Sequence, residues 1–184
     1  IRNVRGERVP WELCATMNNN WGYVPYDTTY KPASMLIRKL VECVSKGGNM
    51  ILNVGPDATG RFPAQSCRLL NEIGEWMALN GKSIYGCGSA ELPKPDWGWY
   101  TGRAGKLYAH VLEAPLGPLP LTGLDPKRVG AVRRLADGGE VVRGESWATS
   151  AYENLAFVSF GTVPQYTYPL PDQIDTVLEI EYPL

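Results

Sequence analysis

Histidine is almost missing from this sequence of 184 residues, in which His110 is the only one. A catalytic triad or a histidine-rich metal site within the chain is therefore nearly excluded. Residues 106–112 alternate between apolar and polar, which predicts a β-strand on which His110 faces solvent. Close cysteine pairs are missing too, so neither a zinc site nor a redox motif is visible and we expect buried free thiols. The sequence predicts no metal and no cofactor.

A strong charge of one sign and a long apolar run are also missing. The chain has 18 basic and 19 acidic residues and a net charge of −1, with no basic cluster that carries interleaved aromatic residues. A nucleic-acid partner is therefore not expected. No stretch reaches the roughly 18 apolar residues that span a bilayer, so no membrane partner is expected either. What remains is the composition of an ordinary globular protein, with 44% hydrophobic residues and a buried core.

Residues 1–90 predict an α/β organisation. An extended segment at 13–17 is followed by a polar turn, and apolar residues at helical spacing then predict a helix over 33–46, which two glycines end. Residues 49–54 are almost continuously apolar and predict a buried parallel strand. A second helix is expected from Pro63 to the Asn-Gly pair that follows residue 79.

Residues 91–184 predict an antiparallel, all-β unit, because proline, glycine and aromatic residues become frequent and helical periodicity disappears. Short alternating segments occur at residues 107–112, 140–143, 155–160 and 176–182. The last of these would close the sheet as its final strand. We set the boundary between the two units between residues 86 and 95.

Residues 55–61 contain two glycines at the spacing of a phosphate-binding loop, but Arg61-Phe62 stands where such a loop needs lysine and a hydroxyl residue. A P-loop is therefore rejected. We expect a tight turn in which Asp57 contacts the loop. Contact of Asn53 or Asp57 with a substrate at the end of the strand is an alternative that structural roles outweigh.

Glu12 is the candidate for acid–base chemistry. It stands between Trp11 and the apolar Leu13, where partial desolvation would favour the protonated form that a general acid needs. From spacing alone a structural ion pair is the commoner use of such a carboxylate. Its candidate partners are Arg2, Arg5 and Arg8.

Three tryptophans suggest contact with a sugar. Trp21 could stack on a sugar face or anchor the core. Trp97 and Trp99 fall on one face of an extended segment, which suggests a carbohydrate platform, although packing between the two units is the favoured use.

Several blocks of the first half occur together and in one order. They are WELCATMN followed by WGY at residues 11–23, LIRKLV and VSKGGN at 36–49, LNVGPD and GR at 52–61, and IGEW and NGKSIYG at 73–86. In this combination the chain closely resembles the α-L-fucosidases of glycoside hydrolase family 29. The resemblance covers nearly all of residues 11–86 and is weak beyond them.

The resemblance implies a (β/α)8-like catalytic barrel followed by an antiparallel β-sandwich. Residues 1–90 would be the C-terminal segment of the barrel and residues 91–184 the sandwich. It also implies the removal of terminal α-L-fucose with retention of configuration, which requires two carboxyl groups. A secreted, periplasmic or lysosomal location fits the family.

Site residues can be carried over only in part. Glu12 matches the acid/base position of several members, Trp21 lies near the sugar pocket, and Arg2 or Arg5 would approach the fucose ring. The nucleophile, an Asp on an earlier barrel strand, has no counterpart in this sequence. We therefore expect the isolated chain to be inactive, with the N-terminal barrel segment as its partner and an oligomer as an open alternative. A non-catalytic carbohydrate-binding or barrel-supporting module is the alternative function.

Overall fold

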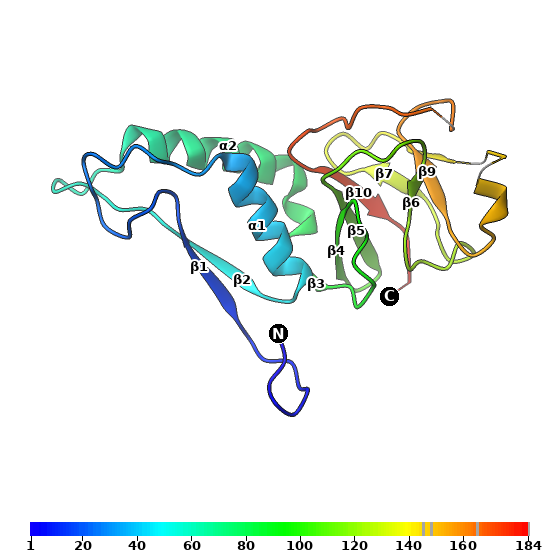
Figure 1. Cartoon of the computed structure of the whole chain (residues 1–184), viewed down its shortest axis with the longest axis horizontal. Helices are drawn as coiled ribbons and strands as arrows, with labels where there is room; N and C mark the ends of the chain where they lie inside the picture. Colours follow the sequence, from blue (N-terminus) through cyan, green and yellow to red (C-terminus); the bar gives the residue numbers. More distant parts are fainter. Residues whose placement is uncertain (145, 148, 165, 184) are drawn as a thin grey trace.

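The computed structural model describes residues 1–144, 146–147, 149–164 and 166–183. Two regions lie side by side, a β/α region at one end and a region of antiparallel strands at the other (Figure 1). Within the described residues, no helix is both long and apolar enough to cross a membrane.

The β/α region is built from two strands and two helices. Strands β1 (Glu12–Thr16) and β2 (Asn49–Asn53) pair in parallel, and helices α1 (Ala33–Ser45) and α2 (Ala64–Asn80) follow them along the chain. A single 3-10 turn, η1 (Gly81–Ser83), continues α2. All four predicted elements are confirmed, with bounds within about one residue of the predicted ones.

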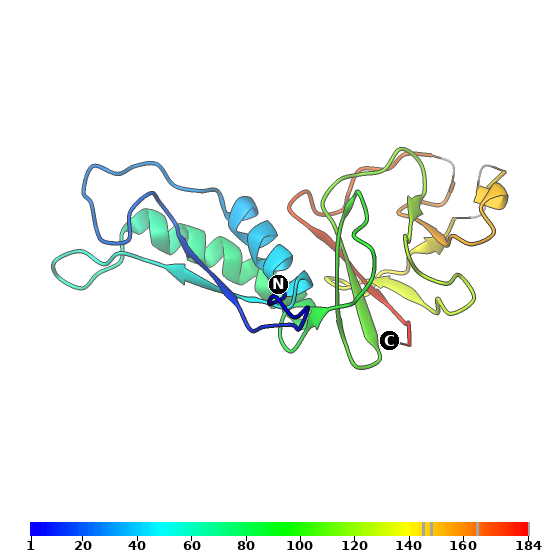
Figure 2. The same ribbon diagram turned by 60° about the horizontal axis from the view of Figure 1, so that its bottom comes forward.

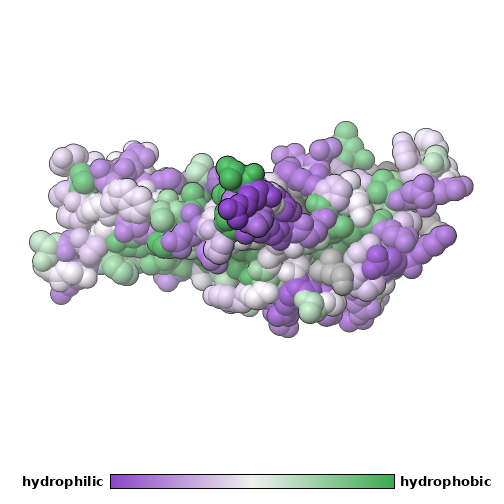
Figure 3. All heavy atoms as spheres, turned by 90° about the horizontal axis from the view of Figure 1, so that it is seen from below, coloured by the Kyte–Doolittle hydropathy of each residue, from purple (hydrophilic) through white to green (hydrophobic). Residues whose placement is uncertain are grey.

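The prediction that β2 is buried is wrong. Helices cover only one face of the two-stranded sheet, where Met50 and Leu52 pack against the cluster of α1 and α2. On the other face Ile51 is 47% exposed. Figure 3, which views the molecule from the side of β1 and β2, shows apolar surface in this region.

The antiparallel region contains two sheets. The first has five strands in the order β3 (Gly88–Ser89), β4 (Gly98–Arg103), β5 (Lys106–Val111), β10 (Thr176–Ile180) and β7 (Val132–Arg134). The second has three strands in the order β6 (Leu119–Pro120), β9 (Phe157–Ser159) and β8 (Val142–Arg143), and a short 3-10 turn, η2 (Thr149–Ala151), lies between β8 and β9 along the chain. Fully buried residues from both sheets, among them Leu107, Val158 and Leu178, share one core. The arrangement is consistent with a β-sandwich (Figure 2).

Strand β10 is the final strand along the chain, as predicted, but its position in the sheet is not at an edge. It lies inside the sheet, hydrogen-bonded to β5 on one side and β7 on the other. An interior strand has neighbours on both sides, and four of its five residues are buried.

The two regions share a joint. Ile37 and Val41 of α1 pack in one cluster with Tyr108 of β5 and Val177 of β10. Arg38 adds a polar tie, because its guanidinium donates to the carbonyl oxygens of Ile174 and Gln173, each at 3.0 Å. Strand β3 lies before residue 90, yet it pairs with β4 of the antiparallel region. The boundary between the two units at residue 90 therefore stays a prediction.

The solvent-facing position predicted for His110 is wrong. Its side chain is fully buried, with Nδ1 at 2.7 Å from Asp175 Oδ2 and Nε2 at 3.0 Å from Thr101 Oγ1. Thr101 in turn donates to the carbonyl of Ser83 in η1 at 2.7 Å. Alternation indicates that one face of β5 is apolar, but α1 and α2 cover the other face as well. His110 therefore belongs to a buried polar chain that ties the sheet to the end of α2.

All four cysteines are free, as expected, but only in part buried. Cys43 is buried and Cys87 half-buried, whereas Cys14 and Cys67 are exposed. Cys14 lies on the uncovered face of β1, and Cys67 lies on the outer side of α2. The expectation of buried thiols is wrong for these two.

Candidate functional site

Loop 18–23 stands where the parallel strands end. Asn53, the last residue of β2, donates from Nδ2 to the carbonyl of Trp21 at 2.6 Å. Just beyond it the chain passes so close that a Cβ on Gly55 would lie 2.6 Å from the carbonyl carbon of Gly22. Only glycine allows this approach. The backbone of the loop is thus pressed onto the end of β2, while the indole of Trp21 remains 59% exposed.

Two charged side chains, which the sequence did not single out, also hold this loop. Asp27 accepts from Asn20 Nδ2 at 2.6 Å, and Lys31 Nζ donates to the carbonyl of Asn18 at 2.6 Å. The hydrogen bond from Asn20, helped by backbone N–H groups, holds the pKa of Asp27 below its usual value. The signal in the sequence was an acidic and a basic residue inside an otherwise Pro/Tyr-rich loop, and it is too common to be specific.

Asp57 caps the turn after β2, as predicted. Its Oδ1 accepts from the backbone N–H of Thr59 at 2.8 Å and of Arg61 at 3.0 Å. The hydrogen bond from the Thr59 hydroxyl, together with those from the two N–H groups, lowers the pKa of Asp57. Gly60 supplies the left-handed conformation, with φ +81°, that closes the turn. Every strong contact of Asp57 is therefore made within its own loop.

Glu12 begins β1 and is exposed on the uncovered face of the sheet. Trp11 and Leu13 do not desolvate it, since neighbouring residues of a strand point to opposite faces. Trp11 instead packs over Gly48, where a Cβ would meet the indole at 2.2 Å. Glu12 forms no ion pair among the described residues either. Of its candidate partners, Arg8 pairs with Glu91 and Arg2 donates to the carbonyl of Gly6. The structure thus supplies neither of the two environments that the sequence suggested.

The predicted site residues lie at opposite ends of the strands. Arg2 and Arg5 belong to a small N-terminal hairpin, which the Arg2–Arg8 bridge closes beside the amino end of β1 (Figures 1 and 2). Trp21 follows the carboxyl end. A five-residue strand rises about 3.3 Å per residue, so its ends are roughly 13 Å apart. The structure brings Trp21 to Asn53 and does not bring Glu12 to Trp21.

Trp97 and Trp99 do not form a common platform. Trp97 is 5% exposed inside the antiparallel core, donates to the carbonyl of Pro120 at 2.7 Å, and meets Tyr100 edge to face. Trp99 packs at the joint between the regions, with Lys46 and Lys94 each 4.9 Å from its ring centroid. Packing is confirmed for both tryptophans, but only Trp99 packs between the two units.

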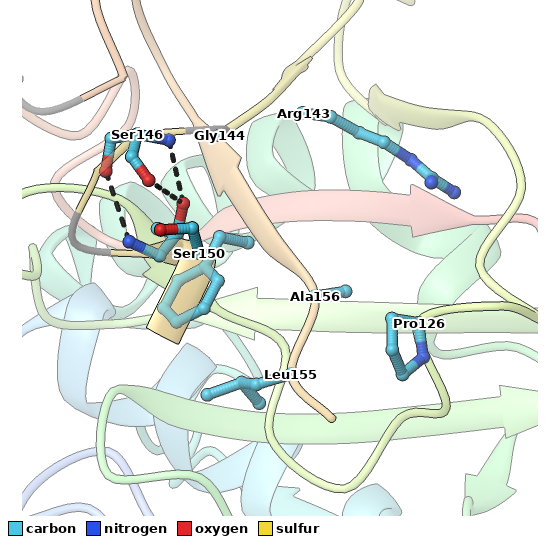
Figure 4. Close-up of a pocket in the computed structure, with 9 residues that line it drawn as sticks. Pro126, Arg143, Gly144, Ser146, Ser150, Leu155 and Ala156 are labelled. Atoms are coloured by element: carbon cyan, nitrogen blue, oxygen red, sulfur yellow. Dashed lines mark hydrogen bonds between the residues drawn. The ribbon is translucent and has the colours of Figure 1, made fainter. Parts of the chain in front are cut away.

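A cavity of about 280 Å³ lies beside β8, β9 and η2 (Figure 4). Its hydroxyl groups are already engaged, since Thr149 Oγ1 donates to the Ser146 carbonyl at 3.0 Å and Ser150 Oγ to that of Trp147 at 2.8 Å. Of the described residues that line it, Arg143 is the one that is charged. Among the described residues that line the cavity, none carries a carboxyl group or an imidazole for acid–base chemistry. In the described part of the chain, no group of three His, Cys, Asp or Glu side chains is placed to hold a metal ion.

Comparisons with known proteins agree on one family. The family model for alpha-L-fucosidase matches residues 2–82. The alpha-L-fucosidase of Dictyostelium discoideum is 42% identical over 110 residues, which cover 57% of this chain and 24% of that protein. The tissue alpha-L-fucosidase of Homo sapiens is 31% identical over 173 residues, which cover 86% of this chain and 34% of that protein.

Solved structures extend the likeness to nearly the whole chain. Alpha-L-fucosidase isoenzyme 1 from Paenibacillus thiaminolyticus is 46% identical with a TM-score of 0.90, over 99% of this chain and 42% of that one. An alpha-L-fucosidase from Bacteroides thetaiotaomicron, trapped as a covalent intermediate, is 29% identical with a TM-score of 0.76, over 98% of this chain and 40% of that one.

The fold and these relatives place the chain among the glycoside hydrolases. More narrowly, it belongs with the α-L-fucosidases of glycoside hydrolase family 29 and resembles their C-terminal portion. The chain spans between 24% and 42% of the length of the four relatives just described.

Proposed function

We propose that this chain acts as part of a retaining α-L-fucosidase that removes terminal α-L-fucose from oligosaccharides or glycoconjugates. The observation that carries the proposal is the 46% identity and TM-score of 0.90 over 99% of the chain with the Paenibacillus thiaminolyticus enzyme. A retaining mechanism needs a carboxylate nucleophile and a second carboxyl group that acts first as acid and then as base.

In this proposal, residues 1–90 form the last part of a (β/α)8-like barrel and residues 91–184 a supporting β-sandwich. The parallel pairing of β1 with β2 supports the barrel, as does the uncovered face that carries Ile51. In the described residues neither strand has a second neighbour, so each has an edge that a further barrel strand could pair with. The partner would be the N-terminal barrel segment.

We assign Trp21 as an aromatic wall of the fucose site. In barrels of parallel strands the active site lies at the carboxyl ends of the strands, and that is where loop 18–23 stands. Glu12, Arg2 and Arg5 lie at the amino end, so the same rule counts against them. A role for Glu12 as general acid/base remains a hypothesis, which the substitution Glu12→Gln tests.

The test is the release of nitrophenol from an aryl α-L-fucoside. The 184-residue chain should be inactive, whereas a protein that carries it behind the upstream barrel segment should turn over the substrate. In that longer protein, Glu12→Gln should lower kcat strongly if Glu12 is the acid/base and should leave it near normal if Glu12 is structural. Glu75→Gln, an exposed carboxylate of α2, is the matched control.

Two outcomes would overturn the proposal. An inactive longer protein would contradict the proposed fucosidase activity. An active isolated chain would contradict the assignment of the nucleophile to another segment. The alternative, a carbohydrate-binding module without catalysis, is weakened because Trp97 is buried and lysines flank Trp99. Sugar binding by the chain without hydrolysis by the longer protein would favour it.

A further inference from the structure

We propose that Asp27 and Lys31 are positioning residues, which hold loop 18–23 so that Trp21 presents a fixed, exposed indole to a sugar ring. This inference deepens the proposed function and rests on it for the identity of the ligand. It assigns a role to two side chains that do not themselves touch the sugar.

Loop 18–23 has no secondary structure to hold it. Among the described residues, no backbone-to-backbone hydrogen bond includes a residue of this loop. Its polar groups instead bond to side chains. A segment with so few backbone bonds opens at low free-energy cost unless side chains fix it. The order of the loop therefore depends on a small number of side chains.

Asp27 makes the first attachment. Its Oδ2 accepts from Asn20 Nδ2 at 2.6 Å and from the backbone N–H of Asn19 at 3.1 Å. Its Oδ1 accepts from the N–H of Thr29 at 3.1 Å. Both carboxylate oxygens thus face donors. An asparagine at this position would turn its own N–H2 group toward at least one of them, which replaces an attraction with a repulsion.

Lys31 makes the second attachment, from the other side. Its Nζ donates to the carbonyl of Asn18 at 2.6 Å and to Thr16 Oγ1 at 3.3 Å. Its own backbone N–H donates to the carbonyl of Met17 at 2.8 Å, which fixes the base of the side chain. The ammonium group thus links the last residue of β1 to the start of the loop. A methionine would keep the length and lose both bonds.

The end of β2 makes the third attachment, through Asn53 and the close approach at Gly55. With the backbone held from three sides, the indole of Trp21 is still 59% exposed. An exposed aromatic ring gains little by stacking if it must first be ordered, because that ordering cost is subtracted from the binding free energy. A loop that is fixed beforehand avoids this cost. The three attachments, which we call the clamp, therefore favour sugar binding as well as the stability of the loop.

The first experiment uses the 184-residue chain and NMR. With 15N-labelled tryptophan, the indole N–H of Trp21 is assigned from its loss in Trp21→Phe, and its heteronuclear NOE reports the order of the ring. We expect Asp27→Asn and Lys31→Met to lower this NOE and to leave the other indoles and the Tm nearly unchanged. Asp57→Asn is the matched control, because Asp57 also accepts several donors within an exposed loop. An unchanged Trp21 NOE in both clamp variants would overturn the proposal.

The second experiment uses the longer protein and the aryl α-L-fucoside. Loss of a preordered wall should raise KM about 5- to 10-fold and leave kcat within about twofold in Asp27→Asn and Lys31→Met, but not in Asp57→Asn. A lowered NOE with an unchanged KM would overturn the role in sugar positioning. If the longer protein does not hydrolyse the fucoside at all, the proposed function fails, whereas the NMR result still decides whether the clamp orders the loop.

Discussion

The five-stranded sheet of the antiparallel region and the two-stranded sheet of the β/α region differ in how completely their faces are covered. In the antiparallel region Leu107, Val158 and Leu178 have no exposed surface, and both faces of β5 are covered. In the β/α region Ile51 is 47% and Met35 49% exposed, and one face of the sheet has no cover among the described residues. The antiparallel region is thus closed, in part because α1 and α2 cover one face of its larger sheet. The open β/α region carries the candidate sugar site and would gain from further cover.

A first test of this contrast is to break the buried polar chain of the closed region. Asp175→Ala leaves His110 buried without its partner at 2.7 Å. We expect the free energy of unfolding to fall by about 2–4 kcal/mol, a large part of the total for a typical domain. Urea unfolding measures it.

A matched control lies on the surface of the same region. Glu140 is exposed and 3.9 Å from Arg133, so Glu140→Gln should change the free energy of unfolding by less than about 0.5 kcal/mol. Equal effects of the two substitutions would show that the buried chain is not important for stability.

The next test compares one apolar residue from each region. Leu178→Ala removes a fully buried side chain and should cost about 2–5 kcal/mol, because a cavity remains. Ile51→Ala should cost less than about 1 kcal/mol in this chain. Urea unfolding of both variants decides, and a larger loss for Ile51→Ala would mean that its face is covered in solution. In the longer protein, that cost should rise.

Thiol labelling gives a third, finer test. Cys14 and Cys67 are exposed, whereas burial raises the pKa of the Cys43 and Cys87 thiols. We expect the two exposed thiols to react with an aromatic disulfide at pH 8 at least about tenfold faster than the other two. Single Cys→Ser variants assign the phases. Equally fast labelling of Cys43 would indicate that α1 opens readily.

The smallest expected effect is a pH dependence of loop 18–23. The pKa of Asp27 is lowered in the folded protein, chiefly by the bond from Asn20, so the carboxylate supports the loop at every pH above the ordinary carboxyl value of about 3.9. That support is lost as the pH falls through the lowered value. The Trp21 NOE should decrease there in the native chain and stay flat in Asp27→Asn. A native profile as flat as that of the variant would contradict the role of the carboxylate.

The sequence predicted the elements of the fold better than their surroundings. Helical spacing identified α1 and a short apolar run identified β2, because both patterns are properties of the element itself. Such patterns failed for His110 and Ile51, because the pattern along a strand does not show what packs against each face. For His110 a helix covers the second face, and for Ile51 no described element does.

The candidate site was predictable only in part, for a geometric reason. Glu12 and Trp21 are close in the sequence, and that closeness suggested a common site. A β-strand separates them, however, and extended chain converts a short stretch of sequence into a long distance. Asp27 and Lys31 were missed because their importance comes from contacts to Asn18 and Asn20 across a loop with no periodic pattern.

The tie between Arg38 and Ile174 also bears on how the protein is made. The two residues are 136 positions apart, so at about 5–20 residues per second the ribosome completes the acceptor roughly 7–27 s after the donor. The side of α1 that carries Ile37 and Val41 is covered by β5 and β10 in the folded protein. During that interval β5 is made first, and β10 is still missing at the end of it. We therefore expect α1 to need protection by a chaperone until β10 has been made.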